Sequence, residues 1–212
     1  VRANGTTLGA DNGLGVATIM AVLESDTIAH PAIEALFTID EETGMTGAIG
    51  LKGGLLEGEI LLNLDTEEDD EIGVGCAGGV DVTASGSYHQ IPAPNGQGYR
   101  IIVKGLQGGH SGMDIIKGLG NANKMMNRLL AANKDVAHIA SLAGGSLRNA
   151  IPRESTATVV VKTQDISEFV LQMEKIQFNL VEEYRLLEPD LTIETQKINA
   201  PQMVMAPKDQ TA

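Results

Sequence analysis

The sequence predicts two domains of different fold class, an α/β portion over residues 1–81 and an α+β domain over residues 82–212. In the first portion, helical and apolar strand-like stretches alternate, which is typical of a parallel sheet with helices. In the second, strand and helix patterns follow the order β-α-β-β-α-β, which is typical of a ferredoxin-like sandwich. A chain of 212 residues is long enough for one large domain or two modest ones, and two is the expected number.

The first portion begins with a predicted helix over 14–23, a stretch rich in small and apolar residues, with Asp11 or Asn12 as its candidate N-cap. Two short apolar runs follow at 33–39 and 59–65, and each is predicted to be a buried strand. Both runs end at acidic residues. Because ligands of parallel sheets bind beyond the carboxyl ends of the strands, these acidic ends mark a candidate site.

The first of these ends carries three consecutive carboxylates, Asp40-Glu41-Glu42, shortly before Gly44. Neighbouring residues of a strand point to opposite faces, so Glu41 and Glu42 serve one site only if the strand has ended and the backbone has turned. Gly44 is expected to supply the permissive dihedral angles for that turn. Adjacent carboxylates repel each other unless a cation lies between them or one holds a proton. The stretch therefore predicts either the active-site turn of a metal-dependent hydrolase or a solvated acidic loop.

The second portion reads as strands and helices of an α+β domain. Strand patterns occur at 99–104, 137–142, 155–162 and 191–194. One helix is predicted over 119–132. A second helix, capped by Asp165, has its apolar face at Phe169, Met173, Ile176, Leu180 and Tyr184. Beyond Ile198 the pattern predicts no element.

Two loops of this second domain carry candidate functional residues. His110 lies among glycines at 108–112, where little bulk is available to bury its ring, so a functional role and ordinary packing are equally supported. In the loop over 144–153, Arg148 and Arg153 could grip a carboxylate with two hydrogen bonds each. Asn149 could donate to an oxyanion. A turn with two solvated arginines is the alternative.

Composition limits the class of partner. The chain has 15 Lys and Arg against 28 Asp and Glu, a net charge of −13, which disfavours nucleic acid and anionic membranes. Its single cysteine, Cys76, excludes an intramolecular disulfide, and no apolar run reaches the roughly 18 residues of a membrane span. A soluble cytoplasmic protein is expected. Because the chain opens on Val1 without an initiator methionine, an internal fragment of a longer protein is also expected.

Six motifs occur in the order found in bacterial aminoacyl-histidine dipeptidases, and up to about residue 188 the chain resembles that family. The motifs are Leu8-Gly9-Ala10-Asp11-Asn12-Gly13, Asp40-Glu41-Glu42, Asn63-Leu64-Asp65-Thr66-Glu67, Gly75-Cys76-Ala77-Gly78-Gly79, Gly108-Gly109-His110-Ser111-Gly112 and Arg148-Asn149-Ala150-Ile151-Pro152-Arg153. These enzymes are co-catalytic zinc metallopeptidases. The resemblance implies that 1–81 is part of a catalytic domain and that 82–212 is most of a lid and dimerisation domain.

The resemblance also assigns roles to individual residues. It implies that Asp11 bridges two zinc ions, that Glu42 and Asp65 are terminal ligands of one ion each, and that Glu41 is the general base. His110 matches the lid histidine that stabilises the tetrahedral intermediate, which related enzymes supply across a homodimer. The implied substrate is a dipeptide, with Xaa-His dipeptides as the expected class.

The resemblance also concerns the residues that bind the substrate and the zinc ligands that this chain lacks. The resemblance implies that Asn149, Arg148 and Arg153 hold the substrate's carboxylate. The family's two further zinc-ligating histidines have no counterpart in this chain. Each ion would then have only two protein ligands, so the 212-residue chain alone is expected to bind zinc weakly and to be inactive. The alternatives are a related amidohydrolase or aminoacylase with the same metal site, and a non-catalytic dimerisation module.

Overall fold

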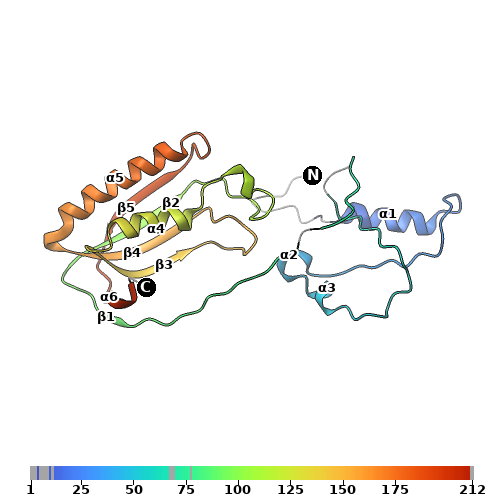
Figure 1. Ribbon diagram of the computed structural model, residues 1–212, viewed down its shortest axis with the longest axis horizontal. Coiled ribbons are helices and arrows are strands. Elements are labelled where there is room, and N and C mark those ends of the chain that lie inside the picture. Colours follow the sequence, from blue (N-terminus) through green and yellow to red (C-terminus); the bar gives the residue numbers. More distant parts are fainter. Residues whose placement is uncertain (1–3, 5–9, 11, 67–69, 77, 211–212) are drawn as a thin grey trace. The chain divides into compact units, whose positions relative to one another are not determined.

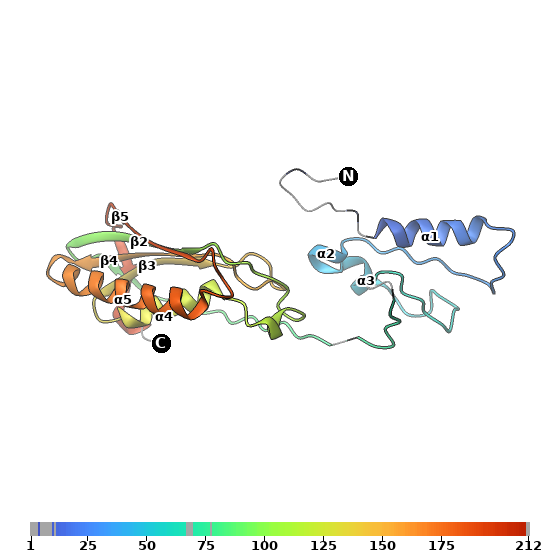
Figure 2. The same cartoon turned by 90° about the horizontal axis from the view of Figure 1, so that it is seen from above.

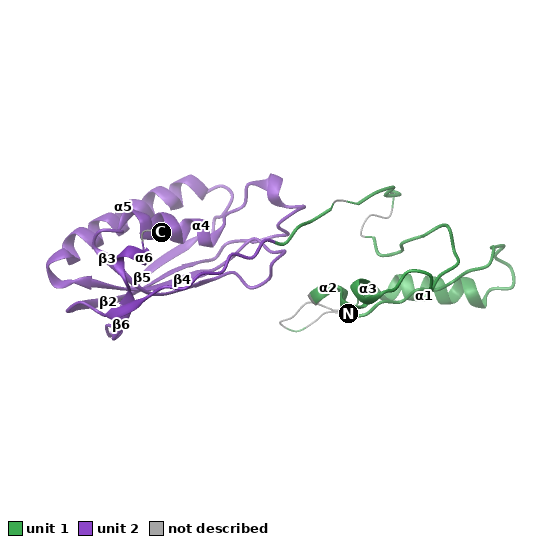
Figure 3. Ribbon diagram, turned by 60° about the horizontal axis from the view of Figure 1, so that its bottom comes forward, with its two compact units in different colours: residues 1–81 green, residues 82–212 purple. Residues whose placement is uncertain are grey.

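The computed structural model of the protein describes residues 4, 10, 12–66, 70–76 and 78–210. The chain divides into two compact units, residues 1–81 and residues 82–212 (Figure 3). The second unit holds the sheets and the apolar core. Among the described helices of both units, none combines the length and the apolar character that a membrane crossing requires.

The second unit is built on a four-stranded antiparallel sheet with strand order β3-β4-β2-β5 (Figure 1). Its elements are β2 (Gly96–Lys104), α4 (Ala122–Ala132), β3 (Ala137–Gly144), β4 (Ser155–Lys162), α5 (Ile166–Tyr184) and β5 (Thr192–Ile198). Short 3-10 turns lie at Ile115–Lys117 and Thr163–Asp165. In the central register, Tyr99 of β2 lies opposite Val159 of β4 and Lys197 of β5. This is the β-α-β-β-α-β order that the sequence predicts.

Both long helices cover one face of this sheet, with their apolar sides toward the strands (Figure 2). The alternation in β2 sets the core: Tyr99, Ile101 and Val103 are buried, whereas Arg100 is exposed. Tyr99 packs on Phe169 of α5 with ring centroids 4.9 Å apart. Asp165 is the N-cap residue of α5 as expected, but its side chain makes no capping hydrogen bond, and a 3-10 turn leads into the helix.

The core predicts a large difference between two leucines near the end of α5. Leu180 is fully buried, whereas Leu186 is 83% exposed. We expect Leu180→Ala to lower the free energy of unfolding by about 2–5 kcal/mol, because it deletes buried methyl groups and leaves a cavity. Leu186→Ala makes the same chemical change in solvent and should stay within about 0.5 kcal/mol of the parent chain. Urea denaturation of both variants checks this, and equal losses would contradict the core described above.

The end of the chain adds elements that the sequence did not reveal. β6 (Met203–Met205) pairs with β1 (Gln90–Pro92) in a two-stranded antiparallel sheet, and α6 (Pro207–Gln210) follows. The side-chain amide of Gln210 accepts a hydrogen bond from Ile139 N at 3.0 Å and donates one to Ala137 O at 2.8 Å. It thereby satisfies backbone groups of β3, a strand at the edge of the larger sheet.

The first unit contains α1 (Gly13–Glu24), α2 (Glu41–Gly44) and α3 (Thr46–Gly50), with most of its side chains exposed. Residues 33–39 and 59–65 were expected to be parallel strands, but the described part of this unit contains no strand. An apolar run becomes a strand only when neighbouring backbone takes up its N–H and C=O groups. These two runs have no such ladder, and Ile60, Leu61 and Leu62 are 83%, 81% and 79% exposed.

Candidate functional site

The acidic turn of the first unit does turn where the sequence required it. Asp40 has a left-handed backbone, with φ 60° and ψ 38°, and Glu41 and Glu42 form the first turn of α2. Gly44 was expected to provide the permissive angles, but it lies within α2, and Asp40 and Met45 take positive φ instead. Aspartate tolerates this region better than most residues because its short side chain hydrogen-bonds locally.

Contacts around the turn separate a structural carboxylate from two exposed ones. Asp40 Oδ2 accepts a hydrogen bond from the Thr46 hydroxyl at 2.8 Å. Gly47 N donates to Ile39 O at 3.2 Å, and a Cβ added at Gly47 would lie 2.7 Å from Ile39 N, so the close approach requires glycine. Asp40 therefore braces the turn. Glu41 and Glu42 are exposed and lie at the positive end of a short helix.

The second acidic segment is tied to the start of α1. Asn12 caps α1, because its side-chain oxygen accepts a hydrogen bond from Gly15 N at 2.9 Å. The same amide donates from Nδ2 to Leu64 O at 2.7 Å. The residue that follows Asp11 is thus bonded to the residue that precedes Asp65. Asp11 itself lies outside the described residues.

A further contact joins the two apolar runs of this unit. Glu34 Oε2 accepts hydrogen bonds from Glu57 N at 2.8 Å and Gly58 N at 2.7 Å. The start of the run over 33–39 therefore lies beside the start of the run over 59–65. The structure gives these acid-bearing segments side-chain to backbone links in place of the predicted strand ladder.

Carboxylate oxygens are suitable ligands for divalent cations, and Asp11, Glu42 and Asp65 each provide a carboxylate. Within the described ranges, which omit Asp11, no group of three or more His, Cys, Asp and Glu side chains is arranged to hold a metal ion. Catalytic zinc sites ordinarily take three protein ligands, histidine nitrogen among them. These three carboxylates therefore fit a zinc site as some of its ligands, and histidine ligands would have to complete it.

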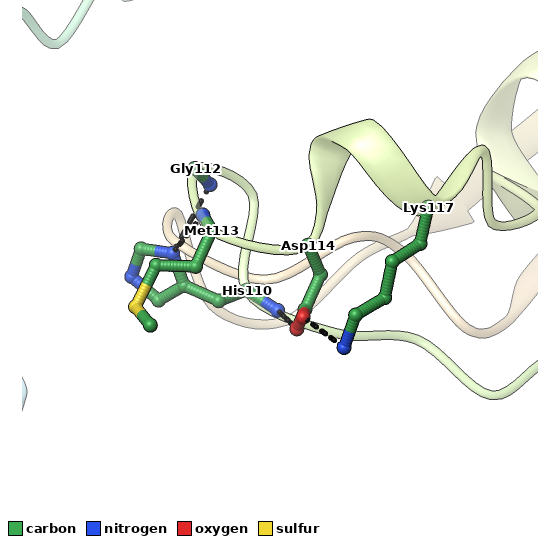
Figure 4. Close-up of polar contacts among 5 residues, drawn as sticks. All are labelled: His110, Gly112, Met113, Asp114 and Lys117. Carbon is green, nitrogen blue, oxygen red and sulfur yellow. Dashed lines mark hydrogen bonds and ion pairs between the residues drawn. The ribbon is translucent and has the colours of Figure 1, made fainter. Parts of the chain in front are cut away.

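In the second unit, His110 lies in the loop between β2 and α4, where backbone hydrogen bonds hold its ring (Figure 4). His110 Nδ1 accepts hydrogen bonds from Gly112 N at 3.0 Å and Met113 N at 3.2 Å. A nitrogen that accepts two N–H groups carries no proton, so this network assigns the proton of the neutral ring to Nε2. The side chain is exposed. The Nε2–H group of His110 is thus an exposed hydrogen-bond donor, and backbone N–H groups of the same loop fix the orientation of its ring.

Asp114 braces the same loop, a role that was not predicted from the sequence. Its Oδ2 accepts a hydrogen bond from His110 N at 2.7 Å, and its Oδ1 pairs with Lys117 Nζ at 2.6 Å (Figure 4). A Cβ added at Gly109 would lie 2.7 Å from Asp114 Oδ2. The glycine beside His110 therefore leaves room for this carboxylate. The spacing of an acid four residues after the histidine was the available signal.

The brace should be visible in a titration. The hydrogen bond from Lys117 lowers the pKa of Asp114 below its ordinary value of 3.8, and the His110 N–H lowers it further. Because the pKa of Asp114 is lower in the folded state, its ionised carboxylate stabilises the fold at pH values above the unfolded-state pKa. This stabilisation is lost as the pH falls through the folded-state pKa. We expect the His110 amide proton shift to titrate with a midpoint below 3.8. Asp114→Asn should abolish that transition, whereas a midpoint at or above the ordinary value would contradict the brace.

The loop over 144–153 is bonded directly to the His110 loop. His110 and Ala150 form an isolated antiparallel bridge, Ser111 N donates to Asn149 O at 2.8 Å, and Ile151 N donates to Gly109 O at 2.8 Å. Backbone contacts thus bring together two residues that the sequence predicted for the site, His110 and Asn149, and both side chains are exposed.

Arg153 has a structural contact in addition to its predicted role. Its Nε donates to Leu106 O at 3.2 Å. A Cβ added at Gly108, where φ is +71°, would lie 2.3 Å from Arg153 Cγ. Glycine at this position therefore allows both the left-handed backbone and the passage of the arginine stem. Arg153 fixes the base of the His110 loop from the neighbouring segment.

An open groove of about 820 Å³ lies between the loop over 144–152 and the start of α4. Its polar lining residues are Ser111, Asn121, Asn123, Lys124, Ser146, Arg148 and Tyr184. Lys124 is an addition to the predicted set, and Arg148 is a member of it. Two cationic side chains in one groove favour an anionic group such as a carboxylate.

Comparison with known proteins gives a family match that lies within the second unit. Residues 101–186 match the M20 peptidase dimerisation domain. Over 169 residues the chain is 47% identical to the cytosol non-specific dipeptidase of Escherichia coli (strain K12), a match that covers 78% of this chain and 35% of that protein. The structure of aminoacylhistidine dipeptidase from Vibrio alginolyticus matches with a TM-score of 0.71 and 42% identity, covering 99% of this chain and 43% of that one. The chain thus spans less than half the length of either relative.

Proposed function

We propose that this chain is part of a cytoplasmic enzyme that hydrolyses dipeptides. Two matches support this: residues 101–186 match the M20 peptidase dimerisation domain, and 78% of the chain is related to a cytosol dipeptidase. The observation that carries the proposal is the 42% identity to an aminoacylhistidine dipeptidase over 99% of this chain, which includes both candidate loops. Xaa-His dipeptides are the proposed substrates. The full-length enzyme is this chain within a protein as long as these relatives.

In this proposal Asp11, Glu42 and Asp65 hold two zinc ions, with the missing ligands supplied from outside this chain. When bound, such ions acidify a water molecule and polarise the scissile carbonyl. Glu41 accepts the proton of the attacking water and can return it to the leaving amine. Its exposure in the first turn of α2 leaves the carboxylate accessible for this transfer.

The second unit contributes binding and charge stabilisation in the same proposal. His110 donates its Nε2–H to the oxyanion that develops on the attacked carbonyl, and it needs no tautomer change to do so because Nδ1 already accepts two backbone hydrogen bonds. Asn149 lies beside it through the backbone bonds of its loop. Arg148, Arg153 and Lys124 hold the substrate carboxylate. The supporting observation is that the groove is lined by Arg148 and Lys124.

A substrate panel tests the function. The full-length enzyme, loaded with zinc, is assayed on an Xaa-His dipeptide, a dipeptide without histidine and an N-acyl amino acid. The proposal expects the dipeptides to be cleaved and the Xaa-His substrate to be preferred. Cleavage of the N-acyl amino acid alone would favour an amidohydrolase or aminoacylase, and no cleavage of any substrate would favour a non-catalytic dimerisation module. The isolated 212-residue chain is expected to be inactive.

We also propose that the protein forms a homodimer through the second unit. Leu171 and Phe178 lie on the outer side of α5, opposite the buried residues, and each is 67% exposed. They are seven positions apart, so they share one helix face. Both fall within the matched dimerisation domain, which makes a second copy the proposed partner for this face.

Charge at the centre of that face should disrupt the dimer. We expect Phe178→Glu to shift the sedimentation equilibrium of the protein from dimer toward monomer, because a carboxylate would be buried without a partner. Asn179→Glu adds the same charge at an exposed position turned away from the Leu171–Phe178 line and should leave the dimer intact. A dimer that survives Phe178→Glu would place the interface elsewhere.

A further inference from the structure

Glu188 is a buried carboxylate placed just beyond the end of α5, and only 1% of its surface is exposed. Its Oε2 accepts a hydrogen bond from Gln107 N at 2.8 Å, and its Oε1 accepts one from Gly120 N at 2.7 Å. Gln107 and Gly120 are the two ends of the loop that carries His110. One side chain, from a segment distant in sequence, therefore closes the base of this loop.

Neighbouring contacts fix Glu188 against the loop. Gln107 Nε2 donates to Leu187 O, and Leu191 N donates to Glu188 O. A Cβ added at Gly105 would lie 2.0 Å from Asp190 O, and one at Gly120 would lie 3.1 Å from Glu188 Cγ. The turn over 187–191 thus packs tightly on both chain segments that lead into and out of the loop.

The contacts at this position suit a carboxyl group. Two backbone N–H groups converge on Glu188, and both of its oxygens are used as acceptors. These two hydrogen bonds offset the cost of burying the polar side chain. A glutamine of the same shape offers one acceptor oxygen and an NH₂ group, which would face an N–H donor. Glu188→Gln therefore breaks one end of the clamp while keeping the volume.

We propose that Glu188 is a positioning residue for His110, holding both ends of its loop so that the ring stays at one place and in one tautomer. The inference rests on the proposed role of His110 in dipeptide hydrolysis. Inside the loop, Asp114 binds His110 N, and Glu188 supplies the outer support. A loop freed at one end opens more often, and a displaced donor no longer meets the developing oxyanion.

The test compares Glu188→Gln with Glu24→Gln in the full-length, zinc-loaded enzyme. Glu24 is an exposed glutamate at the end of α1, so the control removes the same charge without touching the loop or the Leu171–Phe178 face of α5. We expect Glu188→Gln to speed hydrogen exchange at the Gln107 and Gly120 amides by about tenfold or more, as for the loss of one buried hydrogen bond. The nitrogen resonances of the His110 ring should shift. The control should change neither signal.

Kinetics then separate positioning from a general loss of structure. Glu188→Gln should lower kcat by about tenfold or more with little change in KM, and should have no further effect on kcat in a His110→Ala background. Additive losses in the double variant, or unchanged His110 resonances in Glu188→Gln, would overturn the proposal. If Glu188→Gln does not fold, Glu188→Asp, which keeps the charge but shortens the reach, is measured in the same way and with the same criteria.

The proposed function can fail separately from this inference. If His110→Ala alone leaves kcat unchanged, the role of His110 in hydrolysis is refuted. The exchange and resonance measurements do not depend on turnover, so they still decide whether Glu188 fixes the loop.

Discussion

Replacing His110 by alanine in the full-length, zinc-loaded enzyme is expected to lower kcat for a dipeptide substrate by about 10²–10³-fold, the usual cost of removing one oxyanion donor. KM should change far less, because the donor is needed when charge develops on the carbonyl oxygen. The fold should persist, since the His110 side chain is exposed and its backbone N–H still reaches Asp114. Steady-state kinetics with one Xaa-His substrate measures the effect.

His89 supplies the matched control for this experiment. It is also an exposed histidine of the second unit, but its Nδ1 pairs with Asp209 Oδ2 at 3.0 Å, beside the small β1-β6 sheet. His89→Ala should therefore leave kcat close to that of the parent enzyme. A His110→Ala enzyme as active as the His89→Ala enzyme would remove His110 from the reaction.

Replacing Glu41 by glutamine is expected to lower kcat by about 10²–10⁴-fold, the range for loss of a general acid-base group. The amide has the size of the carboxylate but cannot accept the proton of the attacking water. Asp40 and Thr46 hold the turn, and neither contact involves the Glu41 side chain, so α2 should keep its position. The bound zinc, measured by metal analysis after gel filtration, should remain that of the parent enzyme.

Glu24→Gln makes the same change at the exposed end of α1 and should leave turnover and metal content intact. Loss of zinc together with turnover in Glu41→Gln would make Glu41 a ligand. Unchanged turnover would show that this carboxylate is only a solvated part of the turn.

The second unit could be predicted well because its core lies within its own sequence. The β-branched stretch at 155–162 coincides with the bounds of β4. On the predicted helical face, Phe169, Met173 and Leu180 are buried and Ile176 is partly buried. In the first unit, apolar runs identified strand-forming character but not a pairing partner. A short run such as 33–39 becomes a strand only beside another strand, which its own residues do not specify.

The residue types of the candidate site could be predicted from the sequence, but the contacts that hold these residues in place could not. The glycines around His110 indicated a loop, yet their roles, space for Asp114 and for the Arg153 stem, depend on contacts across the loop. Gly44 was the evident turn residue, whereas Asp40 takes the left-handed backbone. Glu188 carried no local signal, because its partners at Gln107 and Gly120 are far away in sequence.

X-ray diffraction at the zinc absorption edge, from crystals of the full-length enzyme grown with zinc, tests the proposed metal centre most directly. We predict two anomalous peaks, with the Asp11 carboxylate between them and Glu42 and Asp65 each bound to one ion. Peaks that lie away from these three carboxylates, or no peaks in crystals of an active enzyme, would contradict the proposed metal centre.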